Sequence, residues 1–417
     1  MKIAVIGAGI IGVTTAYELG RDGHEVTVFE RRGAAAEEAS FANAGIIAPG
    51  YVSPWAAPGM PGKVLSQLLS RHASMRFTLP LGLPELAWLW RWYRACRMDS
   101  YRTNRARLQA LAHYSRQRLH ALSDALRLSF DRSDGYLVLL RTERDRAWAE
   151  PGLQLLRDAG VKFALVDAAQ ARTLEPALNP DTRLHGAIQL PEDEVANCRQ
   201  FALLLKTEAQ RLGVRFRFGT TVAALRSSGG MSVQLQDEPQ AQAFDAVVLC
   251  AGVASAALLR PLGVRLPLVA VHGYSVSAPI REPLNAPRSA VMDERYKVAI
   301  ARLGQRVRVA GGAELGGGLE HKRAAVLHTL YKVLHDWFPG AASHSQGVQV
   351  WKGARPMLPE GPPLVGASGL PGLWLNLGHG SSGWALACGA SRALADMLLG
   401  HAPEIDMAGF ALERSAR

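Results

Sequence analysis

The first thirty residues alternate between apolar and mixed segments in a way typical of a strand–helix–strand unit. An apolar run (MKIAVI) precedes a glycine turn, a segment of helical character follows, and a second apolar run covers residues 25–29 (EVTVF). Short apolar runs rich in β-branched residues are typical of buried parallel strands. The pattern therefore predicts a βαβ unit and an α/β fold class.

Further strand-like runs return only after a loop and a set of arginine-rich helices. Residues 40–59 (SFANAGIIAPGYVSPWAAPG) are small and rich in Pro and Gly, which predicts a loop. The later runs with strand character are GYLVLLRT, HGAIQLPED, VRFRFGTTVAAL, FDAVVLCAG, GYSVSAP, KVAIARL and RVRVAGGAE. The last two flank Gly304 and Gln305 and are predicted to pair as an antiparallel hairpin.

Residue spacing within 83–128 predicts a long amphipathic helix. The positions that recur at helical intervals are Leu108, Leu111, Ser115, Leu119, Leu122 and Leu126. The range 83–128 also holds nine arginines against three acidic residues, with three tryptophans among them. A basic helix with aromatic residues suits either a solvated face or peripheral contact with a membrane surface, and the pattern leaves both open.

The composition excludes several classes of protein. The 417 residues are 48% hydrophobic, which is too apolar for a disordered chain, while the apolar stretches at 3–17 and 246–259 are shorter than a membrane span. The four cysteines lack C-x-x-C spacing, so we expect a cytoplasmic protein without a metal site or disulfides. Much of the net charge of +11 lies in 83–128, and no nucleic-acid partner is expected.

Three glycines at the start of the predicted βαβ unit indicate a dinucleotide site. Gly7 permits a tight turn, Gly9 lets a pyrophosphate approach the backbone, and Gly12 lets helix and sheet pack closely. Glu30, 18 residues after Gly12, can accept hydrogen bonds from ribose hydroxyls and would repel the 2′-phosphate of NADP. Because no further βαβ crossovers follow directly, the interrupted pattern favours FAD over NAD.

A second G-x-G-x-x-G spacing stands near the end of the chain, at Gly378, Gly380 and Gly383. A strand (LWLNL) precedes it and a helix (GWALACGASRALADMLL) follows, but no returning strand remains to complete a second nucleotide unit. We therefore interpret this loop as a helix N-terminus directed at the flavin ring. Backbone N–H groups and the positive end of the helix dipole would stabilise negative charge on the reduced ring there.

Several segments resemble a known family in the same order along the chain. Besides the N-terminal unit they are NAGIIAPGYVSPWAAPG, LPEDEVANC, HGYSV, MDERYKVAIARLGQRVRVAGG, WKGARPMLPEGPPLVG and LWLNLGHGSSGWALACG. From Met1 nearly to Arg417 the chain resembles the small subunit of bacterial D-amino-acid dehydrogenases, within the D-amino-acid oxidase group of flavoproteins. The resemblance implies FAD-dependent oxidation of D-amino acids to 2-oxo acids and ammonia, with hydride transfer from substrate Cα to flavin N5.

The same resemblance implies an electron acceptor other than oxygen. Electrons would pass to a quinone or another respiratory-chain acceptor, at the inner face of the bacterial cytoplasmic membrane. Two alternatives stay open: an oxygen-using D-amino-acid or cyclic imino-acid oxidase of the same fold, and a flavin-binding module whose main role is association with a partner or membrane. His272 stands where the family commonly has lysine, which suggests a different D-amino acid, such as a proline derivative.

The resemblance also implies roles for individual residues. Arg355 lies in a G-x-R-P segment just before the second glycine loop, where its planar fork can hold a substrate carboxylate. Tyr274 is expected to donate its hydroxyl to the same carboxylate, and His379 to tune the flavin or relay protons. The substrate pocket is expected to include Tyr51, His272 and Tyr296.

The implied fold is a discontinuous Rossmann-type FAD-binding domain with an α+β substrate domain built on an antiparallel sheet. We predict residues 1–50, 193–265 and 350–417 for the FAD domain, and residues 51–192 and 266–349 for the substrate domain. The residues expected to bind FAD are Ile6, Gly7, Ala8, Gly9, Ile10, Ile11, Gly12, Glu30, Arg31, Ser40, Asn43, Ala44, Gly45, Val222, Ala251, Gly252, Gly378, His379, Gly380, Ser382 and Gly383.

Overall fold

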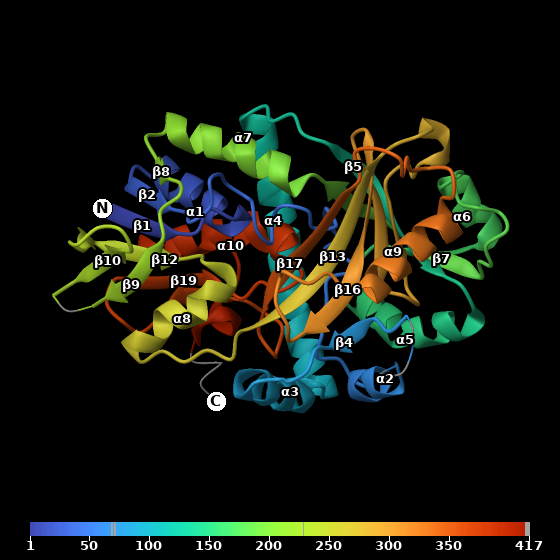
Figure 1. Ribbon diagram of the computed structural model, residues 1–417, viewed down its shortest axis with the longest axis horizontal. Coiled ribbons are helices and arrows are strands. Elements are labelled where there is room, and N and C mark those ends of the chain that lie inside the picture. The colour runs from blue at the N-terminus through green and yellow to red at the C-terminus, as the bar shows by residue number, and fades with distance from the viewer. Residues whose placement is uncertain (68–69, 71, 228, 413–417) are drawn as a thin grey trace.

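Two large sheets lie side by side with helices around both, and a third sheet of three strands covers part of the smaller of the two (Figure 1). The structure is a computed structural model and describes residues 1–67, 70, 72–227 and 229–412. The N-terminal unit and the C-terminal helix lie together in the left half of Figure 1, although they are the two ends of the sequence. A long helix, α4 (Met98–Ala125), runs between the halves.

The smaller sheet has six strands and is parallel apart from one edge. Its strands in spatial order are β18 (Leu364–Ala367), β19 (Leu373–Leu377), β12 (Ala246–Leu249), β1 (Lys2–Ile6), β2 (Glu25–Phe29) and β8 (Arg215–Arg217). Only β18 runs antiparallel to its neighbour among these strands. Strand β1 therefore lies between β2, which follows it in sequence, and β12, which comes more than two hundred residues later. A central first strand of this kind is typical of a Rossmann-type sheet.

Both faces of the six-stranded sheet are covered, which explains why β1 is apolar at every inner position. Ile3 and Val5 pack on one side with α1 (Ile10–Arg21), α7 (Cys198–Arg211), α4 and α10 (Gly383–Leu398). Ala4 and Ile6 face the other side. That side is covered by the three-stranded sheet of β9 (Val222–Arg226), β10 (Met231–Leu235) and β11 (Gln242–Phe244), and by α8 (Ser255–Leu259).

The larger sheet has ten strands, mostly antiparallel. Its main order is β17 (Gln349–Met357), β13 (Val269–Pro279), β16 (Arg306–Leu315), β15 (Val298–Leu303), β14 (Ala290–Asp293), β5 (Arg132–Leu140), β7 (Gly186–Ala196) and β3 (Ile46–Ile47). In addition, β4 (Met75–Phe77) pairs with β16 and β6 (Ala164–Asp167) pairs with β7. Long antiparallel strands place alternate side chains on opposite faces, so each strand contributes to two separate cores.

Helices cover the two faces of the large sheet separately. One face packs against α9 (Ala324–Trp337) and α6 (Ala168–Leu174). The opposite face packs against α5 (Glu143–Asp158) and α3 (Leu83–Ala95), which follows α2 (Met60–Gln67) along the lower edge of Figure 1. A residue on one face of the large sheet therefore packs against α9 and α6, and a residue on the other face packs against α3 and α5.

The predicted elements agree with this architecture. The βαβ unit, the hairpin of β15 and β16, and the final strand and helix are all present, and the predicted fold class is confirmed. The helical stripe lies on α4, where Leu108, Leu111, Ser115, Leu119 and Leu122 are buried. The domain boundaries stay a prediction. Strand β17 pairs within the ten-stranded sheet, although the predicted FAD domain includes most of it.

Candidate active site

A cavity of about 1170 Å³ lies where the two sheets meet. Its wall includes the start of α1, the loop at 39–46, strands β13 and β17, and the loop that enters α10. The first residues of both α1 and α10 line it, so two helix N-termini face the same space. Helix N-termini carry partial positive charge and unpaired N–H groups, which suits an anionic or electron-rich ligand.

The turn between β1 and α1 can only be built from glycine. Gly7 has a φ of 101°, and a Cβ placed on it would lie 2.7 Å from the carbonyl oxygen of Cys250. A Cβ on Gly12 would lie 1.8 Å from the carbonyl oxygen of Gly7. Close backbone packing therefore requires glycine at both positions, and a glycine turn of this kind before a helix N-terminus is the form of site that binds a pyrophosphate.

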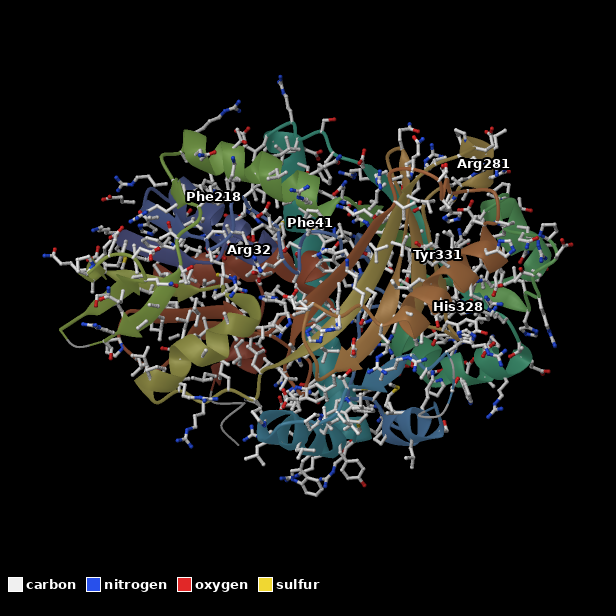
Figure 2. The ribbon with its side chains drawn as sticks, viewed as in Figure 1. Arg32, Phe41, Phe218, Arg281, His328 and Tyr331 are labelled. Atoms are coloured by element: carbon white, nitrogen blue, oxygen red, sulfur yellow. The ribbon has the colours of Figure 1, made fainter. Side chains whose placement is uncertain are left out.

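Glu30 lies beside that turn at the end of β2. Its Oε2 accepts a hydrogen bond from the Ala8 N–H at 2.7 Å, and its Oε1 accepts one from the Arg32 N–H at 2.8 Å. Arg32, labelled in Figure 2, marks the point where the chain leaves the sheet. A carboxylate held at this position can accept hydrogen bonds from ribose hydroxyls next to the glycine turn.

The loop at 40–45 closes the cavity from the side of α7. Ser40 Oγ accepts from the Ile10 N–H at 3.0 Å, which places the loop against the start of α1. Phe41, labelled in Figure 2, packs 4.4 Å from the Arg199 guanidinium on α7. Arg308 of β16 donates from Nη1 to the carbonyl oxygen of Asn43 at 2.9 Å. These contacts fix the loop from both sheets.

His379 is buried in the second glycine loop and lines the cavity. Its Nε2 lies 2.8 Å from Asn376 Oδ1, while Asn376 Nδ2 donates to Thr15 Oγ1 at 3.0 Å. This orientation of the amide assigns the ring hydrogen to Nε2 and leaves a lone pair on Nδ1. Nδ1 has no partner among the described residues, and burial lowers the pKa of His379 to about 3. The ring is therefore neutral at ordinary pH.

Arg355 projects from β17 into the same cavity. Its Nη1 donates to the Gly312 carbonyl oxygen at 2.9 Å, and its guanidinium carbon lies 5.7 Å from the centre of the Trp55 ring. Within the described part of the chain it forms no ion pair, and burial lowers the pKa of Arg355 to about 10 without an opposing carboxylate. An arginine with pKa 10 is still charged at neutral pH, so the site holds an unneutralised cation.

Two tryptophans and two glycines shape the space around Arg355. The Trp55 indole N–H donates to Ser381 Oγ at 3.0 Å, which ties the ring below the guanidinium to the second glycine loop. Trp351 lies on the same strand as Arg355, and its ring covers Gly353 between them. On the neighbouring strand, Gly273 leaves room for the guanidinium itself. The result is an aromatic pocket with one cation, which suits a small carboxylate.

Comparison with known proteins identifies the group to which this site belongs. The family model described as FAD dependent oxidoreductase (DAO) matches residues 2–397. The chain is 44% identical over 418 residues to a D-amino acid dehydrogenase of Cereibacter sphaeroides, covering all of this chain and 96% of that protein. It is 41% identical to a protein of the same name from Rhizorhabdus wittichii, covering 99% and 100% of the two chains.

The chain belongs to the FAD-dependent oxidoreductase family. Solved structures with the same fold include glycine oxidase from Geobacillus kaustophilus, with a TM-score of 0.78, 22% identity, and coverage of 98% and 97% of the two chains. L-proline dehydrogenase from P. horikoshii has a TM-score of 0.74 at 16% identity, covering 99% and 98%. The cofactor is FAD, and the glycine turn that any Cβ would fill provides the room it requires.

Most predicted FAD-binding residues of this oxidoreductase lie around the cavity or the glycine turn. Those that line the cavity are Ile10, Ile11, Ser40, Asn43, Ala44, Gly45, Gly252, Gly378, His379, Gly380, Ser382 and Gly383. Those at or beside the glycine turn are Ile6, Gly7, Ala8, Gly9, Gly12 and Glu30. Arg31 lies at the surface with its guanidinium on Glu38, while Val222 begins β9 and Ala251 follows β12. Their contacts with FAD stay predictions.

The side chains of Tyr274 and His272 have contacts that the sequence interpretation did not give them. Arg355 pairs with Val271 in the ladder, so residues 272 and 274 project from the opposite face of β13. The Tyr274 hydroxyl donates to Glu314 and accepts from the Arg323 N–H at 3.2 Å, and its ring packs with α9. His272 lies on that same face, with Glu314 and Lys352 as its charged neighbours, and does not line the described cavity. Tyr274 does line the cavity, so its contact with the substrate carboxylate stays a prediction, while His272 is not among the described lining residues.

The two remaining pocket predictions differ in outcome. Tyr51 lines the cavity, where its hydroxyl donates to Glu294 and accepts from Lys297 Nζ at 3.2 Å. Tyr296 does not line it. Its ring lies 5.0 Å from the Arg141 guanidinium and packs edge-on against His72, so it belongs to the α9 side of the sheet. The role of Tyr296 in the substrate pocket therefore gains no support from the cavity and stays a prediction.

Three residues of the site had no role in the sequence interpretation. Trp351 could have been found from Arg355, because residues four apart in a strand share a face. Trp55 stands in the loop that resembles the family, but an isolated tryptophan in a loop carries no positional signal. Arg308 reaches Asn43 from a strand more than two hundred residues away in the chain, and no local pattern indicates that contact.

Proposed function

We propose that this protein is an FAD-dependent dehydrogenase that oxidises D-amino acids to 2-oxo acids and ammonia. The main support for the proposal is the buried guanidinium of Arg355. It has no acidic partner within the described residues, and it lines the same cavity as the N-terminus of α10. The curated relatives named D-amino acid dehydrogenase support the substrate class. Substrate Cα loses its hydrogen as hydride, the amine loses a proton, and water hydrolyses the resulting imine.

Arg355 binds and orients the substrate in this proposal. Its fork donates hydrogen bonds to both oxygens of the α-carboxylate, and a charge-assisted bidentate contact in a largely dry pocket is stronger and more directional than one in water. Trp55 below the guanidinium and Trp351 beside it restrict the positions that Cα can take. Bound FAD supplies the two-electron acceptor at N5. Orientation of this kind can contribute on the order of 7 kcal/mol to catalysis.

His379 acts in its neutral form. Because burial lowers the pKa of His379 to about 3, the ring is a weak base and is a poor proton relay at neutral pH. Its free Nδ1 lone pair is instead a fixed hydrogen-bond acceptor at the cavity wall, held in orientation by Asn376. We therefore assign it to positioning of the flavin or of the substrate amine, which is nearer to the tuning of the flavin than to the proton relay that the sequence interpretation also offered.

Flavin bleaching tests the proposed reaction directly. Under anaerobic conditions D-alanine should bleach the bound flavin, while L-alanine should leave it oxidised. The reduced protein should then be reoxidised faster by a soluble quinone analogue than by air. Faster reoxidation by air would support an oxygen-using oxidase, and the absence of bleaching by any D-amino acid would contradict the proposal.

The outer face of α3 supports electron transfer to an acceptor at a membrane. Four residues that share this face are more than half exposed, and they are Leu83, Leu86, Trp90 and Tyr93. Arg94 and Arg97 lie at the surface beside them. An exposed apolar stripe with neighbouring cations matches an anionic bilayer surface, in which apolar side chains enter the interface and arginines meet lipid phosphates. No helix in the described residues is long and apolar enough to span a bilayer.

This location differs from the broader range of 83–128 suggested by the sequence. On α4, Arg116 and Arg118 pair with Glu192 and Glu18, and Arg105 is buried, so that helix offers fewer free cations than its composition indicates. In this proposal α3 docks on the inner face of the bacterial cytoplasmic membrane. Four free cysteines fit a reducing compartment.

Vesicle binding by matched variants tests the proposed surface. The wild-type protein should sediment with phosphatidylglycerol vesicles and be released by salt. Replacing Leu86 and Trp90 by serine should abolish sedimentation, whereas Leu284→Ser, at another highly exposed leucine, should not. Equal sedimentation of the double variant and the wild type would contradict this surface, as would an equal loss in the Leu284 control.

A further inference from the structure

Arg105 is a second buried guanidinium in the cavity that contains Arg355. It lies on α4, is 5% exposed, and lines the cavity. Its Nη1 donates to the Tyr101 hydroxyl at 3.2 Å, and its guanidinium lies 5.9 Å from the centre of that ring. Its Nε is buried with no hydrogen-bond partner among the described residues.

The lack of an acidic partner, together with its burial, distinguishes Arg105 from two paired arginines of the same helix. Arg116 pairs with Glu192, and Arg118 pairs with Glu18. In the described structure Arg105 has no such ion pair; its hydrogen-bond partner is a neutral phenol. An uncompensated buried charge costs several kcal/mol of desolvation, so its presence needs a compensating ligand.

The balance of charge in the cavity points in the same direction. Among the described residues, six basic side chains line it: Lys63, Arg102, Arg105, Arg144, Lys297 and Arg355. Two acidic side chains of the described residues also line it, Asp158 and Glu294. Glu294 is already engaged by Lys297 and Tyr51. The cavity thus holds more positive charge than one α-carboxylate would neutralise.

The surroundings of Arg105 belong to the substrate side of the cavity. Gly152 of α5 approaches its Nη1, since a Cβ on that glycine would lie 3.7 Å away. Arg105 is also close enough to Tyr51 to influence its titration electrostatically. The glycine turn and Glu30, which receive the adenine dinucleotide, lie on β1, α1 and β2. The contacts of Arg105 are therefore with elements other than those that carry the glycine turn.

We propose that Arg105 binds an anionic group at the end of the substrate side chain, so that the enzyme favours acidic D-amino acids. This inference rests on the proposed function, in which Arg355 holds the α-carboxylate. The two guanidiniums then bind opposite ends of one dicarboxylic substrate. We expect the anionic group of the side chain to be a carboxylate. A planar guanidinium can bind a planar carboxylate through two parallel hydrogen bonds.

A series of substrates tests the proposal in the holoenzyme. Anaerobic flavin reduction is measured with D-aspartate, D-glutamate and D-2-aminoadipate, with D-alanine as the reference. One of the three should have a higher kcat/KM than D-alanine. Arg105→Met should lower that ratio by roughly tenfold or more, as expected for a lost charged hydrogen bond, and Arg105→Lys should lower it less. Arg107→Met, on the same helix but not among the described residues that line the cavity, is the matched control and should change the ratio less than about threefold.

Binding without turnover separates this proposal from a folding defect. Glutarate and butyrate are titrated into the oxidised enzyme and followed by the shift of the flavin spectrum. Glutarate should bind more tightly in the wild type, and Arg105→Met should remove that advantage while retaining butyrate binding and FAD. Equal affinity for both acids in the wild type would overturn the inference, as would an unchanged advantage in Arg105→Met. If D-alanine itself fails to reduce the flavin, the proposed function fails instead.

Discussion

The guanidinium of Arg355 lies against Gly273 across the ladder of β13 and β17. A Cβ placed on Gly273 would come within 2.3 Å of Arg355 Nη2 and 2.4 Å of its central carbon. Residue 273 must therefore be glycine because a larger residue would collide with Arg355. Its backbone φ is not positive and would by itself allow other residues. The orientation of the cation depends on the absence of a neighbouring side chain.

Gly273→Ala should displace the guanidinium and lower kcat/KM for flavin reduction by D-alanine by about tenfold or more, since small misplacements of an orienting group have large kinetic effects. FAD content should stay close to that of the wild type, because Gly273 is outside the glycine turn. Gly318→Ala is the matched control, since a Cβ there meets no atom within 4 Å. Parental kinetics in Gly273→Ala would show that Arg355 does not act from this position.

Tyr274→Phe should affect stability more than catalysis. The hydroxyl donates to Glu314, a buried carboxylate that also pairs with Lys352 at 3.0 Å. Loss of a hydrogen bond to a charged group costs about 1.5–3 kcal/mol, and chemical denaturation should show a loss of that order. The Michaelis constant for D-alanine should rise by less than about threefold, because the hydroxyl already donates to Glu314 and the substitution removes no positive charge from the site. A large rise in KM with unchanged stability would support the role suggested by the sequence.

The pH dependence of stability should report the burial of His379. Burial lowers the pKa of His379 from 6.5 to about 3, so between these values the unfolded chain binds a proton that the folded chain does not. Stability must then fall as the pH falls through 6.5, and at pH 5 the loss from this residue is about 2 kcal/mol.

The comparison of wild type with His379→Gln isolates that contribution. Glutamine keeps hydrogen-bonding capacity but cannot titrate, so the loss of unfolding free energy between pH 7 and pH 5 should be smaller in the variant by about 2 kcal/mol. Denaturant titrations at both pH values give the difference, and other titrating groups cancel in it. Parallel pH profiles for the two proteins would mean that the imidazole is accessible to protons in the folded state.

Local patterns in the sequence were sufficient for the parts of the site that are built by short segments. Gly7, Gly9 and Gly12 indicate a nucleotide turn because the steric demand lies within one βαβ unit. The same holds for the second glycine loop, whose flanking strand and helix are contiguous. These features need only periodicity and glycine spacing to be recognised.

Residues whose role depends on strand register were not predictable in this way. Tyr274 and Arg355 are close in the fold, yet they project from opposite faces, and only the pairing of Arg355 with Val271 reveals it. Arg105 could have been placed in the interior, because it precedes Leu108 by three residues and shares the buried stripe of α4. Its missing acidic partner is a property of the tertiary structure alone.

The most direct test of the account is anaerobic flavin reduction by D-alanine in Arg355→Lys and Arg355→Ala. Lysine keeps the charge but loses the bidentate fork, and alanine loses both, so kcat/KM should fall progressively, by roughly a hundredfold or more in the alanine variant. FAD content should remain parental in both. Reduction of the alanine variant at the wild-type rate would contradict the account, and so would a loss of activity that is explained entirely by loss of FAD.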